Sequence, residues 1–274
     1  MARKIYLTVL FLFALGFSYG NKPQTEESNE KMVLIKTKFG NMKVKLYNET
    51  PLHRDNFLKL INDGFYNDLL FHRVIKEFMI QGGDPGSKGA SPNKQLGAGD
   101  VGYTIPAEIN SKYFHKKGAL AAARTGDNIN PERRSSGCQF YIVHGRTYNA
   151  ATINKLEEKQ KNQLIQAEVN RLTKIRQKEI QQLKKEEKRD SVEIIKSEII
   201  KQAENQIDAS KYSYSPEKRS AYTTIGGTPH LDGAYTVFGE VVEGLNIIDS
   251  IANVQTAPGD RPVQDIKFQI IEVK

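Results

Sequence analysis

The amino-acid sequence predicts a mainly β fold, a closed antiparallel β-barrel from which an inserted α-helical hairpin projects. Short segments of alternating apolar and polar residues recur between residues 32 and 273, as is typical of strands. Glycine-rich turns separate them, and closure into a barrel would remove exposed strand edges. Residues 149–222 differ, because they lack glycine and are rich in Lys, Glu and Gln, which favours helices.

The first elements are a hairpin and a helix. Residues 32–38 and 41–46 alternate as strands on either side of a Gly40-Asn41 turn. Thr50 then suits the N-cap of a helix and Pro51 its first position. Gly64 is expected to end this helix.

The remaining barrel elements follow in order along the chain. The pattern indicates one further short helix over residues 245–251 and a glycine-rich loop over residues 82–102. The predicted strands cover residues 70–74, 78–81, 119–123, 139–144, 235–242 and 266–273.

The N-terminus is typical of a secretory signal. Arg3 and Lys4 precede an apolar run over residues 5–17, and small residues follow at positions 18 and 20. The run is shorter than the about 20 residues of a membrane span. We therefore expect a signal peptide over residues 1–20, a linker over 21–30, and an exported chain, periplasmic or secreted, with no membrane span after cleavage.

Composition restricts the classes of function. The net charge of +8 is spread along the chain, and no basic patch with interleaved aromatics is present, so we expect no nucleic-acid binding. Cys138 is the only cysteine, which excludes an internal disulfide. The five histidines show no metal-ligand spacing, and no metal or cofactor is expected.

The charged segment over residues 149–222 is expected to form two helices that meet near Asp190. Asp190 and Glu193 have the spacing of a helix N-terminal box. Apolar residues follow helical spacing on both sides of it, but not as a sustained heptad. Two interpretations remain open: a solvated insertion whose stripes pack on each other, or an arm for self-association or for holding clients.

The residues from 71 to 84 suggest a chemistry. Arg73 precedes an apolar pair, Phe78 and Met79, and Gln81 follows. A fixed cation beside a small apolar surface suits binding of a proline ring and action on the preceding amide bond. That bond rotates slowly, because resonance gives a barrier of about 18–20 kcal/mol. His72 is expected to face the opposite side of the strand as a hydrogen-bonded structural residue.

Three segments in the right order resemble the cyclophilin-type peptidyl-prolyl cis-trans isomerases, in a bacterial-like form. They are residues 71–84, 136–142 and 231–239. The resemblance covers residues 31–148 and 223–274, and residues 149–222 interrupt it as a helical insertion. It implies an eight-stranded closed antiparallel barrel capped by two helices.

The resemblance also implies the site. Arg73 matches the catalytic arginine, and Gln81 the glutamine beside it. Tyr141 stands where the family usually has phenylalanine, and His230 and Tyr235 replace a common tryptophan and histidine. We expect both tyrosine hydroxyls to point toward the wet side of the groove. The residues expected to bind substrate are Phe78, Met79, Ala123, Tyr141, His230, Leu231 and Tyr235.

The predicted function is therefore peptidyl-prolyl isomerisation that assists the folding of exported proteins. Its partners would be proline-containing polypeptides. The alternative is a chaperone module that binds proline-containing segments, in which residues 149–222 hold clients or mediate assembly.

Overall fold

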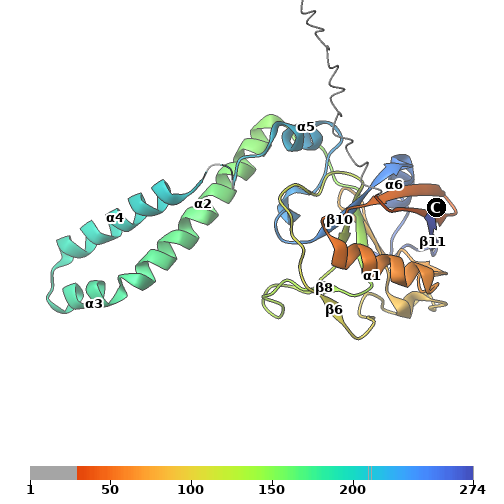
Figure 1. Ribbon diagram of the computed structural model, residues 1–274, viewed down its shortest axis with the longest axis horizontal. Coiled ribbons are helices and arrows are strands. Elements are labelled where there is room, and N and C mark those ends of the chain that lie inside the picture. The colour runs from red at the N-terminus through yellow and green to blue at the C-terminus, as the bar shows by residue number, and fades with distance from the viewer. Residues whose placement is uncertain (1–29, 209, 211, 274) are drawn as a thin grey trace, which may run out of the picture.

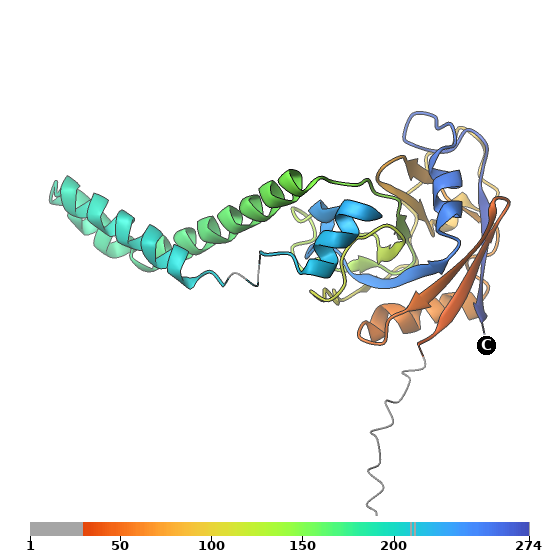
Figure 2. The ribbon, with the colours of Figure 1, turned by 90° about the horizontal axis from the view of Figure 1, so that it is seen from above.

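The computed structural model describes residues 30–208, 210 and 212–273. The signal and nearly all of the linker predicted over residues 1–30 lie outside this range. A curled antiparallel sheet and its covering helices form the body, and a long helical arm extends from it (Figures 1 and 2). Among the described residues, no helix is both long and apolar enough to cross a membrane.

The main sheet has nine strands and is open, so the closed eight-stranded barrel is not confirmed. Its strand order is β3-β11-β1-β2-β10-β7-β9-β5-β4, and every pairing is antiparallel. The strands are β1 (Met32–Thr37), β2 (Gly40–Leu46), β3 (Leu69–Leu70), β4 (Arg73–Ile75), β5 (Met79–Gly82), β7 (Ala119–Ala122), β9 (Phe140–Val143), β10 (Val237–Glu243) and β11 (Lys267–Val273).

The chain itself joins the two ends of this order. β3 and β4 are separated only by Phe71 and His72. The backbone N–H of Phe71 donates to Ile266 and that of Val74 to Asp260. These donors are therefore satisfied by the segment before β11. A separate small sheet pairs β6 (Thr104–Ile105) with β8 (Ser135–Ser136).

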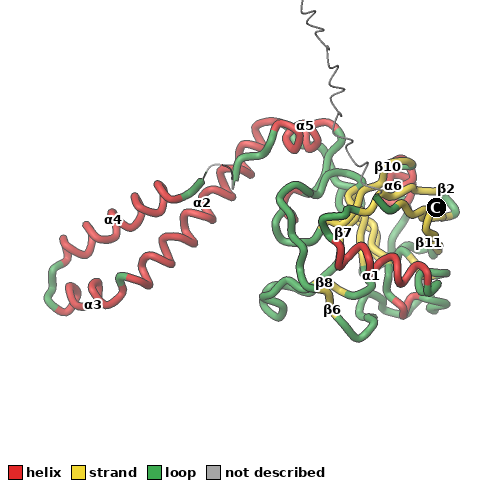
Figure 3. Tube along the Cα trace, in the orientation of Figure 1, coloured by secondary structure: helices red, strands yellow, loops and turns green. Residues whose placement is uncertain are grey.

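The main core lies between the sheet and two helices, α1 (Pro51–Asn62) and α6 (Leu245–Ala252) (Figure 3). Phe57 of α1 and Ile248 of α6 are buried in the same cluster as Val44 and Leu46 of β2. Pro51 starts α1 as predicted, but Thr50 makes no side-chain cap. The carboxylate of Glu108 accepts the first backbone N–H groups instead, from Leu52 and His53.

The arm consists of α2 (Ala150–Ile175), α3 (Gln177–Lys185) and α4 (Arg189–Gln206), followed by α5 (Pro216–Thr224) beside the barrel. It has a core of its own, in which Leu172 and Ile180 face Val192, Ile195 and Ile199. The two predicted helices are thus three, because the first leg breaks at Arg176.

Two polar details of the arm also differ from expectation. Lys188, and not Asp190, is the N-cap of α4, without a side-chain cap, and Asp190 lies in its first turn. Arg176 donates to Glu179 within its own leg and to Glu198 across the hairpin. This pairing holds the break between α2 and α3 against α4.

Histidine burial predicts acid sensitivity. Burial lowers the pKa of His53, His144 and His230, and that of His72 to about 4. The unfolded chain therefore binds more protons than the native state as pH falls from about 6.5. Because stability rises with pH where the unfolded state binds more protons, the free energy of unfolding should fall between pH 6.5 and 4.

His72→Leu should reduce this slope. Both ring nitrogens of His72 are buried, and desolvation is the largest cause of its lowered pKa, so the change removes a buried titratable group. Urea unfolding at a series of pH values measures the slope. An unchanged slope in His72→Leu would contradict the assignment.

Candidate active site

The register of the sheet aligns the predicted polar residues in one row. Arg73 of β4 is paired with Gln81 of β5, and Gln81 is paired with Tyr141 of β9. Tyr141 is paired in turn with Ala121 of β7. Directly paired residues of antiparallel strands project from the same face. The cation predicted to act is thus on the face that carries Tyr141.

An apolar cluster lies on this same face, apart from the main core. Its buried members include Met79 and Tyr141, which are only 2% and 4% exposed. The partly buried Phe78, Ala123, Leu231 and Tyr235 pack against it. His230 lies with its ring centroid 5.6 Å from that of Phe78. The structure therefore gathers every residue predicted to bind substrate.

Arg73 is partly exposed and is held at two nitrogens. Nε donates to Asp260 at 3.3 Å, and Nη1 donates to Gln81 at 3.5 Å. Among the described residues these are its hydrogen-bond partners, so Nη2 is available to a ligand. Asp260 itself has a left-handed backbone, with φ of 62°, and its carbonyl accepts from Val74 beside Arg73. No local pattern in the sequence indicates this acceptor, which lies 187 residues from Arg73.

A second set of hydrogen bonds orients Gln81. Its Nε2 donates to Oε1 of Gln139 at 3.0 Å. Gln139 in turn donates to the backbone carbonyls of Gly97 and Gly99, at 3.0 and 2.7 Å. The side-chain NH₂ group of Gln139 donates to both carbonyls. The side-chain oxygen of Gln139 is therefore the atom that faces Gln81. Gln81 then presents its own oxygen to Arg73.

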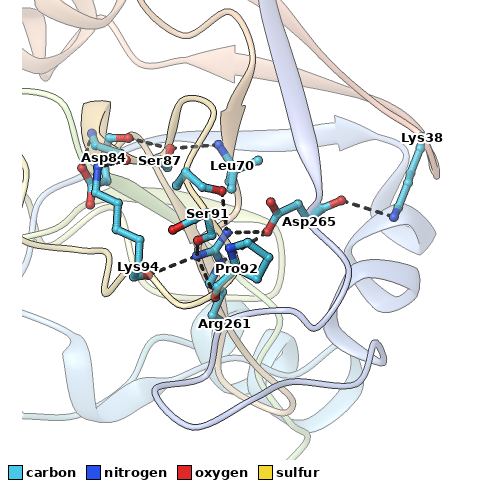
Figure 4. A network of polar contacts seen from close by, with 11 residues as sticks. Lys38, Leu70, Asp84, Ser87, Ser91, Pro92, Lys94, Arg261 and Asp265 are labelled. Atoms are coloured by element: carbon cyan, nitrogen blue, oxygen red, sulfur yellow. Dashed lines mark hydrogen bonds and ion pairs between the residues drawn. The ribbon is translucent and has the colours of Figure 1, made fainter.

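A cavity of about 1290 Å³ adjoins Arg73 and Gln81. It lies between the loops over residues 92–98 and 257–263. Arg261 fastens these loops together, because its guanidinium donates to the carbonyls of Ser91, Pro92 and Lys94 and to Asp265 (Figure 4). His72 lines this cavity with Arg73.

The apolar end of the site holds a second arginine that the sequence reasoning missed. The guanidinium carbon of Arg124 lies 4.4 Å from the centroid of the Tyr235 ring. Its Nε donates to the carbonyl of Ala234, and its Nη1 pairs with Asp127. Arg124 directly follows the predicted Ala123, and this adjacency was the available signal. Arg124 therefore packs over the partly buried ring of Tyr235.

The hydroxyl of Tyr141 does not point to the groove's wet side, contrary to expectation. It lies 3.0 Å from Nε2 of His115, in a buried position behind the apolar cluster. Burial raises the pKa of Tyr141 well above its usual value, so the hydroxyl stays protonated. No motif or metal-ligand spacing in the sequence indicates this contact of His115.

The comparisons with known proteins agree with this geometry. Residues 32–273 match the family described as "Cyclophilin type peptidyl-prolyl cis-trans isomerase/CLD". A "Putative peptidyl-prolyl cis-trans isomerase" of Staphylococcus saprophyticus is 30% identical over 92% of this chain and 98% of its own length. A "Putative bifunctional phosphatase/peptidyl-prolyl cis-trans isomerase" of Streptococcus pyogenes is also 30% identical, but the match spans only 41% of its length.

A solved structure shows the same fold. The cyclophilin type peptidyl-prolyl cis-trans isomerase of Cryptosporidium parvum superposes with a TM-score of 0.51 over 89% of this chain and 98% of that chain, at 19% identity. The family match covers nearly the whole described chain, including the row of Arg73, Gln81 and Tyr141. This chain belongs to the cyclophilin-type peptidyl-prolyl cis-trans isomerase family.

Proposed function

We propose that Arg73 is the catalytic residue of this isomerase and that Gln81 orients it over a proline ring held by the apolar cluster. The single observation that supports this proposal is the register that puts Arg73, Gln81 and Tyr141 in one row beside that cluster. Met79 and Tyr141 form the buried floor. Phe78, Ala123, His230, Leu231 and Tyr235 form the accessible walls.

Catalysis then needs no covalent step. Rotation about the amide bond is easier when the prolyl nitrogen becomes pyramidal and its lone pair leaves conjugation with the carbonyl. A guanidinium N–H directed at that nitrogen stabilises the twisted amide more than the planar one, which is differential binding of the transition state. Because Nε and Nη1 of Arg73 already have partners, Nη2 is the group that would donate. The donor is oriented before substrate binds.

We further propose that the clients are exported proteins and that the chain is of a bacterial type, with residues 149–222 as an insertion in the family fold. The N-terminal pattern of two cations, an apolar run and small residues supports export to the periplasm or the medium. A fusion of residues 1–30 to alkaline phosphatase, which folds only after export, tests this. Phosphatase activity in intact cells is expected, and its absence would contradict export.

A second candidate function is favoured by the arm. α2 and α4 extend away from the body and carry exposed Ile175, Ile194 and Ile200 outside their own core (Figure 2). A client-holding or self-associating arm would work beside the isomerase and not in place of it. The arm and the site can be separated by truncation.

Arg73→Ala should lower turnover of a proline-containing tetrapeptide by about 10²–10³, the usual effect of removing one preorganised donor. Arg73→Lys should also be impaired, because lysine lacks the planar fork that meets Asp260 and Gln81 together. A protease-coupled isomerisation assay measures both. Near-normal rates for Arg73→Ala, with the variant folded, would remove Arg73 from the mechanism.

Gln139→Met should reduce kcat/KM by about tenfold, because Gln81 loses the partner that fixes the direction of its amide. The change is close to isosteric, and residue 139 is two hydrogen bonds away from Arg73, through Gln81. Gln163→Met on the exposed surface of α2 is the matched control and should be neutral. Equal activity of Gln139→Met and Gln163→Met would refute the orienting role.

Replacing residues 162–206 with a short Gly-Ser linker should leave peptide turnover within about twofold, since the truncation keeps α5 and the first turns of α2 that contact it. The same variant should lose protection of an aggregating client if the arm holds clients. Aggregation measured by light scattering, with and without the arm, separates the two functions. Loss of peptide turnover would show that the arm is part of the catalytic unit.

A further inference from the structure

A buried polar chain runs from the floor of the apolar cluster to α5. It begins at the Tyr141 hydroxyl, which lies 3.0 Å from Nε2 of His115. Nδ1 of the same ring lies 3.0 Å from Oδ1 of Asp232, and His115 is only 1% exposed. His115 and Asp232 thus come from two distant loops and meet directly behind the proline-binding face.

Chemistry fixes the direction of the hydrogen bond between His115 and Asp232. Burial alone would raise the pKa of Asp232, but the hydrogen bond from His115 and the charge of Lys218 outweigh it and hold the pKa below its usual value. The ionised carboxylate can only accept, so Nδ1 of His115 carries a proton. Nε2 of the same ring is the hydrogen-bond partner of the Tyr141 hydroxyl.

The far oxygen of Asp232 is held by α5. Oδ2 accepts from the Tyr222 hydroxyl at 2.7 Å and lies 2.8 Å from Nζ of Lys218. Oδ1 also accepts the backbone N–H of His115 at 2.9 Å. Each carboxylate oxygen therefore has two donors, which is the full satisfaction that a buried charge requires.

α5 is in turn fastened to the root of the arm. Glu157 of α2 accepts from the backbone N–H of Tyr214 and pairs with Arg219 of α5 at 2.5 Å. Tyr222 packs in one apolar cluster with Phe114 and with Ile153 of α2. Contacts are thus continuous from α2 through α5 and Asp232 to Tyr141.

We propose that His115 and Asp232 are positioning residues for the isomerase, and that Lys218 and Tyr222 of α5 complete this support. The proposal rests on the proposed function, because it assigns the support of that site. The Tyr141 hydroxyl lies behind the apolar cluster that we propose to hold the proline ring. Without His115 the Tyr141 hydroxyl would be buried without a partner. The Tyr141 ring would then shift, or water would enter beside it, and either change would move the buried floor of the substrate-binding cluster.

A double-mutant cycle tests this proposal. His115→Leu should lower kcat/KM for a proline tetrapeptide by about tenfold. In the Tyr141→Phe background, where no hydroxyl needs a partner, the same change should lower it by no more than about threefold. His115→Asn, which keeps a donor for Asp232 but does not reach Tyr141, should behave like His115→Leu in both backgrounds.

The chain offers a matched control in His53. It is a second buried histidine, 2% exposed, with Nδ1 2.7 Å from the Glu108 carboxylate, but it lies against α1 and Phe238 in the main core. His53→Leu should lower the melting temperature comparably while leaving kcat/KM unchanged. Tyr222→Phe, which removes one donor from Asp232 and conserves shape, should lower kcat/KM by about threefold.

The outcomes distinguish a failure of the positioning role from a failure of the proposed isomerase function. Equal losses from His115→Leu in both backgrounds, or a loss no greater than that of His53→Leu at equal stability, would overturn the positioning role. The isomerase assignment would survive in that case, because the wild type would be active and Arg73→Ala inactive. An inactive wild type would overturn the proposed function itself.

Discussion

The pairing of β4, β5 and β9 is the constraint on which the site depends. Arg73, Gln81 and Tyr141 share a face only because each is paired with the next in an antiparallel register. A slip of one residue would send the guanidinium to the face of Val74 and Ile80, which are buried in the main core. An unpaired guanidinium there would be too costly to bury. The same hydrophobic pattern that forms the core therefore fixes where the charge lies.

Support for this row comes from segments far apart in the sequence. Asp260 accepts a hydrogen bond from Nε of Arg73. Gln139 accepts one from Gln81 and is itself held by donating to the loop carbonyls of Gly97 and Gly99. Arg261, next to Asp260, fastens the loop over residues 90–94. The two loops around Arg73 are thus set by neighbouring residues of one turn. An orientation held from several sides loses little entropy when substrate binds, which is the basis of preorganisation.

Local patterns could predict the strands and the central part of the site, but not how distant segments meet. Alternation located the strand regions, and three motifs located Arg73, Gln81 and the apolar set. Asp260, His115 and Asp232 carry no local signal, because their roles arise from contacts across more than a hundred residues. Thr50 is the N-cap of α1 as predicted, but its hydroxyl does not accept the first backbone N–H groups of the helix, and the N–H groups of Phe71 and Val74 also have distant partners. Glu108 and the segment before β11 satisfy those backbone groups from a distance.

The boundary expected at residue 222 illustrates what composition alone cannot show. Residues 149–222 look uniform, yet α5 spans Pro216–Thr224, and that boundary falls inside it. Most of the segment packs on itself around Ile195 and Ile199, and so is energetically separate from the barrel. Its last part instead supplies Tyr222 to a cluster with Phe114, and Lys218 to Asp232. By its contacts, α5 therefore belongs to the body. The arm begins in α2 after Ile153, the residue that packs with Tyr222.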